Sequence, residues 1–318
     1  MKKGWLWSSF FFGIPCNCAV ETQRIASLQR KIARLRYSDF VYLCTLKKTA
    51  ENMALIQSME QSGAKLFKYR GQIPVLIFAL SLPILFFTND KLYASISARW
   101  GWGGPLYITC TIISLLLVFA GLALRAYTVC TTPKGTSGRN TAQQVADHLN
   151  TKGIYSVVRH PLYLANYLIW AGLLVYTMNI FAFVTVSLVY WIYYERIMMA
   201  EEAFLRSKYG DEFEEWAAKV PAFIPKWSLY EPGMLQFSWK TLIRREYATF
   251  MSVLVSYTVL DYALFERIVM QNLARPELDD PAEPWFFLNL TIAYAVIALL
   301  IKLIKHKTHW LDATPDRD

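Results

Sequence analysis

The sequence predicts an all-α, polytopic integral membrane protein with about six transmembrane helices. Six apolar segments make up 107 of the 318 residues and contain only two of the 57 charged residues, Asp261 and Lys302. The remaining 211 residues carry 55 charges, a density of 26%, close to the roughly 25% of an ordinary soluble protein. Nearly charge-free segments of bilayer length therefore alternate with water-adapted loops, which excludes a soluble enzyme. The segments are 73–88, 106–124, 161–178, 180–194, 247–265 and 285–304.

The basic residues are divided unequally between alternate loops. Of the 33 Lys and Arg, one set of loops holds 28 and the other set holds 4. Because basic loops stay in the cytoplasm, we expect both termini to be cytoplasmic, in a bacterial inner membrane. The net charge of +9 then reflects topology and attraction to anionic headgroups. A nucleic-acid partner would need a basic folded module, and none is visible in the sequence.

The regions of the chain differ in character. Residues 1–52 form a basic extension in which 21–48 has the spacing of an amphipathic surface helix, although a dispensable extension before Met53 is the simpler interpretation. Residues 53–130 hold the first two spans, and Arg125 at the second span's end can extend to the headgroups. The five Cys and four His supply no ligand cluster, so no metal is expected.

The third and fourth spans are joined by barely a residue around Asn179, which predicts a tight antiparallel hairpin within a core at 131–227. Its two cytoplasmic ends then lie side by side. Residues 228–318 supply two further helices and a tail. Asp261 is the one intramembrane charge without an evident role, and an intramembrane acid usually faces a partner. A structural pairing is the preferred interpretation, with Arg125 or a lipid amine as the partner.

The most informative residues lie at the two cytoplasmic ends of this hairpin. Gly153 begins the pattern G-x-Y-x-x-x-R-H-P-x-Y at the start of the third span. Pro161 can open a helix there, because its missing N–H would be unsatisfied at that position. Arg159 and His160 then stand at the headgroup boundary, to which Glu201 and Glu202 return through the hairpin. Such a cluster is a plausible cradle for a charged cofactor, although spacing alone does not say which one.

Both half-motifs together resemble the isoprenylcysteine carboxyl methyltransferase and phospholipid methyltransferase superfamily over about residues 140–225. The second half-motif is E-E-x-x-L-x-x-x-x-G-x-x-[YF], followed by a closing V-P-x-x-I-P that ends at Pro225. The resemblance implies S-adenosylmethionine as methyl donor and a lipid-borne acceptor. It places Leu149, Asn150, Tyr155, His160, Pro161, Leu162, Tyr163 and Glu201 at the cofactor, and the family's usual Gly is Ala165 here.

Substrate binding is assigned to polar and charged residues near the cytoplasmic ends of the hairpin. Carboxyl methyltransferases place an Arg four residues before the first matching Glu; this position is Ile197 here, and Arg196 is the adjacent substitute. Arg196, Arg159 and His160 are the candidate catalytic residues, and the expected acceptor contacts are Arg139, Asn140, Arg196 and Glu202.

The acceptor preferred from the sequence is a lipid phosphate. The turn at 134–140 offers hydroxyls, backbone N–H groups and two cations, which suit a phosphate. This turn and the two additional spans also resemble the bacterial lipid A phosphate methyltransferase branch. N-methylation of an aminophospholipid, with His160 as base, and carboxyl methylation of a prenylated cysteine are alternatives. A transporter or a non-catalytic membrane scaffold is the alternative from another class.

Overall fold

A computed structural model describes residues 54–87, 105–133, 146–233, 235–274, 285–308 and 310–312. The chain divides into two compact units, 1–57 and 58–318, and every labelled element belongs to the second. The expected basic extension 1–52 and the turn at 134–140 lie outside the described residues. The predicted domain boundaries and the cytoplasmic orientation of the termini stay predictions.

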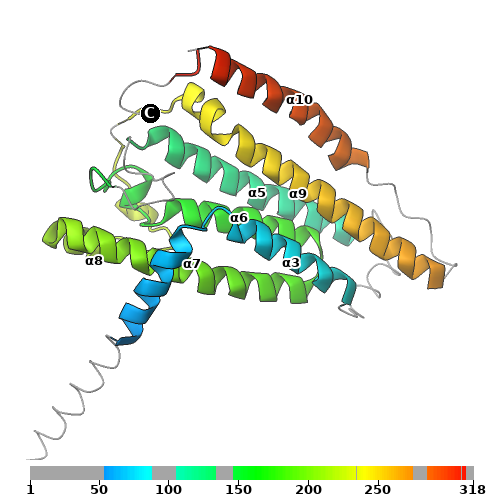
Figure 1. The fold of residues 1–318 in the computed structure, drawn as a ribbon, viewed down its shortest axis with the longest axis horizontal. Coiled ribbons are helices and arrows are strands. Elements are labelled where there is room, and N and C mark those ends of the chain that lie inside the picture. The colour runs from blue at the N-terminus through cyan, green and yellow to red at the C-terminus, as the bar shows by residue number, and fades with distance from the viewer. Residues whose placement is uncertain are drawn as a thin grey trace, which may run out of the picture. The chain divides into compact units, whose positions relative to one another are not determined.

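The second unit is built from helices (Figure 1). The described residues contain no strand, only an isolated bridge between Gly153 and Glu231. A helical stretch at 54–67 precedes the labelled elements. These are α3 (Ile73–Phe87), α5 (Pro105–Thr131), η1 (Ile154–Ser156), α6 (Pro161–Tyr176), α7 (Ile180–Tyr209), α8 (Asp211–Lys219), η2 (Trp227–Leu229), α9 (Trp239–Ala274) and α10 (Trp285–Lys307).

Four of the helices in the described part of the chain are long and apolar enough to cross a membrane, namely α5, α7, α9 and α10. The expected count of about six is not confirmed, because α3 and α6 have only 15 and 16 residues. At 1.5 Å per residue they extend about 23 Å, short of a hydrocarbon core of about 30 Å. The helix that contains the expected fourth span is longer than its apolar segment: α7 begins at Ile180 and continues past residue 194 to Tyr209.

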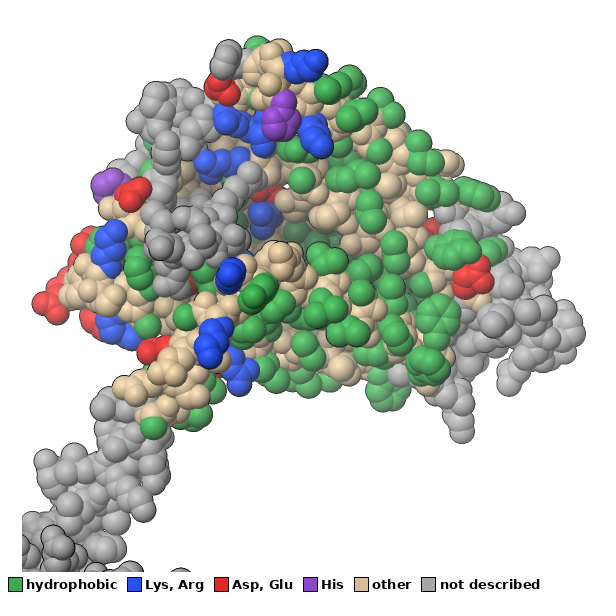
Figure 2. Space-filling view, viewed as in Figure 1, with side chains coloured by type: hydrophobic (Ala, Val, Ile, Leu, Met, Phe, Trp, Pro, Cys, Tyr) green, Lys and Arg blue, Asp and Glu red, His purple; other side chains and the backbone are tan. Residues whose placement is uncertain are grey.

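Apolar side chains cover much of the surface of the helices, whereas charged side chains gather toward one end (Figure 2). Phe87, Phe119 and Phe286 are 86%, 71% and 71% exposed. Exposure of this kind on long apolar helices fits contact with lipid tails rather than with water. The four helices and this surface indicate a multi-pass membrane protein.

Helices α5 and α6 pack so closely that glycines are required at two points. A Cβ on Gly121 would lie 2.6 Å from the Ala165 carbonyl oxygen, and one on Gly172 would lie 2.7 Å from that of Ser114. Ala165 is fully buried. The contact between Gly121 and the Ala165 carbonyl lies near the start of α6 and helps to position the motif there.

Asp261 on α9 accepts a hydrogen bond of 2.6 Å from the Tyr176 hydroxyl, which also lies 3.2 Å from that of Tyr107. Asp261 is therefore paired with a tyrosine of α6 and not with Arg125. Arg125 instead donates from Nε to Glu246 Oε2 at 2.6 Å and from Nη1 to Asn166 Oδ1 at 2.8 Å. Its polar group is bound between helices, so it does not simply extend toward the headgroups.

Candidate functional site

The site begins where α6 begins. His160 is the N-cap residue of α6 and Pro161 is its first residue, as expected for a proline that needs no N–H partner there. The His160 side chain makes no capping hydrogen bond to the helix. The imidazole is therefore available to the acidic residues of α7.

The closing V-P-x-x-I-P segment holds the R-H-P motif by its backbone. The N–H groups of Arg159 and His160 donate to the carbonyls of Pro221 and Ala222 at 2.9 and 3.1 Å. Farther along, the Lys226 N–H donates to the Val157 carbonyl at 2.9 Å, and Gly153 pairs with Glu231. Gly153 has a φ of +63°, which favours glycine. The two sequence motifs are thus one structural unit.

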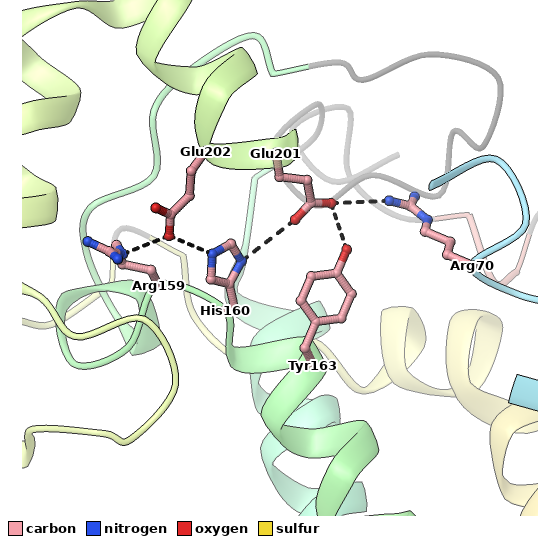
Figure 3. A network of polar contacts seen from close by, with 6 residues as sticks. All are labelled: Arg70, Arg159, His160, Tyr163, Glu201 and Glu202. Atoms are coloured by element: carbon pink, nitrogen blue, oxygen red, sulfur yellow. Dashed lines mark hydrogen bonds and ion pairs between the residues drawn. The ribbon is translucent and has the colours of Figure 1, made fainter. Parts of the chain in front are cut away.

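Glu201 and Glu202, near the end of the long helix α7, both reach His160 (Figure 3). His160 Nε2 lies 2.9 Å from Glu202 Oε1, and Nδ1 lies 3.6 Å from Glu201 Oε2. The imidazole is 6% exposed. Burial acts to lower the pKa of His160, but the hydrogen bonds and charges of the two carboxylates outweigh burial and raise that pKa above its ordinary value. The arrangement favours an imidazolium held between two carboxylates.

Each carboxylate has a second set of partners. Tyr163 donates its hydroxyl to Glu201 Oε1 at 2.7 Å, and its ring stacks beside His160 with centroids 5.7 Å apart. Arg159 places Nε 3.0 Å from Glu202 Oε1 and donates from Nη1 to the Ala217 carbonyl at 2.7 Å. The network therefore connects the start of α6, the end of α7 and the C-terminal end of α8.

Arg70 is the member of this network that the sequence reasoning missed. Its Nη1 lies 3.4 Å from Glu201 Oε1, and its guanidinium carbon lies 4.0 Å from the centre of the Phe67 ring (Figure 3). Arg70 is 131 positions from Glu201 in the chain, and no motif includes it. Only its place, three residues before the apolar helix α3, gave a signal, and that signal also fits an ordinary headgroup anchor.

The other predicted residues differ in how they relate to this network. Tyr155 lies beside it: burial, and then the charge of Glu201, raise the pKa of its hydroxyl. Asn150 accepts from the Lys152 N–H at 3.3 Å within its own loop, and Leu149 and Leu162 are half-buried. Arg196 donates to the Ile192 carbonyl of its own helix at 3.4 Å. Arg139 and Asn140 lie outside the described residues. The assigned roles of all these residues stay predictions.

The donor set fits a ligand that carries charges of both signs. The carboxylates of Glu201 and Glu202 suit an ammonium or sulfonium group, and Arg70 and Arg159 suit a carboxylate or phosphate. Within the described ranges, no group of three or more His, Cys, Asp or Glu has the arrangement of a metal site. The fold and this cluster define a helical membrane protein with a charged site at the ends of its apolar helices.

The central part of the chain is similar to a family of membrane methyltransferases and to several named proteins. Residues 108–212 match the family described as phospholipid methyltransferase. A stretch of 135 residues is 33% identical to a cobalt-zinc-cadmium resistance protein of Cupriavidus metallidurans, covering 42% of this chain and 56% of that protein. Another of 120 residues is 34% identical to a probable protein-S-isoprenylcysteine O-methyltransferase of Oryza sativa subsp. indica, covering 36% and 60%.

A shorter stretch of 81 residues is 42% identical to a protein-S-isoprenylcysteine O-methyltransferase of Schizosaccharomyces pombe, covering 25% of this chain and 34% of that protein. No solved structure matches this chain. The matches span little more than half the length of the first relatives. They support the isoprenylcysteine and phospholipid methyltransferase superfamily for the central part of the chain, as the motifs predict; they give no support to the lipid A phosphate branch.

Proposed function

We propose that this protein is an S-adenosylmethionine-dependent membrane methyltransferase that methylates an acidic oxygen of a lipid-borne acceptor, most simply the carboxyl group of a prenylated cysteine. The observation that carries the proposal is the network in which His160 lies between Glu201 and Glu202. The names of the relatives from rice and fission yeast favour carboxyl methylation.

The residues of the network would have different roles toward the cofactor. Glu201 and Glu202 would hold cationic or hydroxyl groups of the cofactor, and His160 with Tyr163 fixes the two carboxylates in place. When bound, S-adenosylmethionine supplies a methyl group already activated on a positively charged sulfur, so an acidic oxygen that attacks the methyl carbon leaves the C–S electron pair on sulfur. An ionised carboxyl or phosphate oxygen needs no general base at neutral pH. The protein's main contributions are alignment and the exclusion of water.

A lipid phosphate is the second candidate acceptor, and the basic turn at 134–140 is its main support. That turn lies outside the described residues, and Arg196 donates to its own helix, so the carboxyl acceptor now has the stronger argument. N-methylation of an aminophospholipid would require His160 to remove a proton. The geometry disfavours that role, because both ring nitrogens of His160 already face carboxylate oxygens, Nε2 at 2.9 Å from Glu202 and Nδ1 at 3.6 Å from Glu201.

The test is incubation of the purified full-length protein with methyl-labelled S-adenosylmethionine and each of three acceptors: a prenylated cysteine, phosphatidic acid and phosphatidylethanolamine. We expect base-labile label on the carboxyl group. Glu201→Gln and His160→Gln should weaken cofactor binding about tenfold or more, since each removes a charged hydrogen-bonding partner. Glu215→Gln, on the exposed face of α8, is the matched control.

Label on the ethanolamine nitrogen would refute the acidic-oxygen proposal, and stable label on phosphatidic acid would favour the second candidate. Wild-type protein that neither binds the cofactor nor transfers label would favour the alternative of a non-catalytic membrane scaffold. Unchanged cofactor affinity in both Glu201→Gln and His160→Gln would mean that the network described here is not the cofactor site.

A further inference from the structure

Arg70 belongs to a part of the chain that the family match does not include. The match covers residues 108–212, whereas Arg70 lies in the turn between the helical stretch 54–67 and α3. The part of that stretch around Gly63 packs on α7 near Glu201: a Cβ on Gly63 would lie 1.8 Å from the Arg196 carbonyl oxygen and 3.0 Å from the Ala200 Cβ. This close approach of Gly63 to α7 holds the nearby backbone of Arg70 close to Glu201.

The depth of Arg70 relative to the bilayer follows from the helix that it precedes. Ile73 begins α3, whose 15 residues contain no charge, so Arg70 stands three residues outside an apolar segment. Basic side chains at such positions lie at the level of lipid headgroups. A lipid-borne acceptor that approaches Glu201 from the bilayer therefore meets Arg70 at the depth of its own headgroup.

The contact between Arg70 and Glu201 is one that an incoming anion could replace. Its side chain is 15% exposed, its guanidinium lies over the Phe67 ring at 4.0 Å, and its Nη1 is 3.4 Å from Glu201 Oε1. That distance exceeds the 2.7–2.9 Å typical of charge-assisted hydrogen bonds. Tyr163 donates to the same oxygen at 2.7 Å, so the carboxylate keeps a strong partner when the guanidinium turns to another anion.

Arg159, the other arginine of the network, is bound on its other side by α8. It donates from Nη1 to the Ala217 carbonyl at 2.7 Å, and its Nε lies 3.0 Å from Glu202 as an ion pair. Glu201 and Glu202 by themselves would repel an anionic acceptor. A cation at the headgroup level, next to the carboxylates, is what an acidic acceptor needs in order to approach them.

We propose that Arg70 binds the anionic group, carboxylate or phosphate, of the lipid-borne acceptor and so selects acidic acceptors for this site. The planar guanidinium presents paired N–H donors that match either group. The proposal rests on the proposed function, because it names the residue that would recognise the acceptor of that reaction. It makes Arg70 a substrate-binding residue and leaves cofactor binding to Glu201, Glu202 and His160.

The experiment compares Arg70→Ala and Arg70→Lys with Lys68→Ala, which removes a positive charge from an exposed side chain two residues away. Binding of a prenylated cysteine and of its uncharged methyl ester is measured on full-length protein in lipid nanodiscs, as is binding of phosphatidic acid and of diacylglycerol. Affinity for S-adenosylmethionine is measured on the same samples, and the KM for each acid wherever turnover is found.

We expect the wild type to prefer at least one acid over its uncharged counterpart by about tenfold or more, the effect of one charged hydrogen bond. Arg70→Ala should erase that preference and change cofactor affinity less than about twofold. Arg70→Lys should keep part of the preference, since a single point charge remains. Lys68→Ala should behave as the wild type. If the preference is seen for the prenylated cysteine over its methyl ester, the bound group is a carboxylate; if it is seen for phosphatidic acid over diacylglycerol, the bound group is a phosphate.

The outcomes separate this proposal from the proposed function. If Arg70→Ala loses as much affinity for S-adenosylmethionine as it loses for the acid, the inference is overturned, because Arg70 would then act through Glu201. A wild type without acid preference, or a preference that survives Arg70→Ala, would also overturn it, even if methyl transfer is normal. If methyl transfer is absent but Arg70→Ala still erases acid preference, the inference stands as an anion site and the proposed reaction fails.

Discussion

The ion pair between Arg125 and Glu246 gives the sharpest test of how the C-terminal helices join the rest of the molecule. Arg125 comes from α5, within the segment that matches the family, and Glu246 comes from α9, outside it. Their side chains are 21% and 2% exposed, and Nε lies 2.6 Å from Oε2. Glu246 Oε1 has no hydrogen-bond partner among the described residues. A buried pair of this kind binds two helices together through charge.

The perturbation is a double-mutant cycle of Arg125→Met, Glu246→Leu and the two combined. Removing one member of a buried pair costs about 3–5 kcal/mol, because the remaining charge has no counter-ion. Arg125→Met should lie in that range, since the remaining carboxylate is almost fully buried. Glu246→Leu should cost less, about 2–3 kcal/mol, because Arg125 is partly exposed and keeps Asn166 as a partner.

The combined variant should be less destabilised than either single variant. An apolar replacement of a whole buried pair is often neutral, and it also removes the unmatched Oε1, a group whose burial costs about 1–3 kcal/mol. The coupling energy, which is the sum of the single losses minus the loss in the combined variant, should therefore exceed the larger single loss, about 3 kcal/mol or more. The assay is reversible unfolding in mixed micelles, followed by tryptophan fluorescence. Additive losses, or single losses below about 1 kcal/mol, would refute the reasoning that charge joins α9 to α5.

Two further predictions concern His160 and the α5–α6 contact. Because the folded pKa of His160 is raised, its imidazolium contributes stability that is fully present below about pH 6.5 and lost as pH rises through the folded pKa; the Tm difference between wild type and His160→Gln should shrink between pH 6 and pH 9, and a constant difference would contradict this. Gly172→Ala should destabilise by about 1–3 kcal/mol, because its Cβ would lie 2.6 Å from Val118 Cγ2; Gly71→Ala, where a Cβ meets nothing within 4 Å, is the control for a thermal melt.

The sequence by itself determined that the protein is helical and crosses the membrane more than once, and it predicted the residues at the centre of the candidate site. Charge-free stretches predict membrane helices because burying a charge in lipid is costly. The charged residues in each stretch can be counted from the sequence without knowing the fold. The R-H-P and E-E motifs lie at opposite ends of two helices joined at Asn179, so their meeting follows from a short connection. The count of about six spans is not confirmed, because α3 and α6 have only 15 and 16 residues whereas four other described helices are long enough to cross a membrane.

Tertiary structure alone decided which distant charges meet. Arg70 reaches Glu201 across 131 positions, and Arg125 reaches Glu246 across 121. No local pattern encodes either pairing, because an arginine beside an apolar segment looks the same whether it contacts lipid headgroups or a buried carboxylate. The difference depends on how helices far apart in sequence pack. The close approach of Gly63 to α7 and of Gly172 to α5 sets that packing, since a Cβ at either position would force the helices apart.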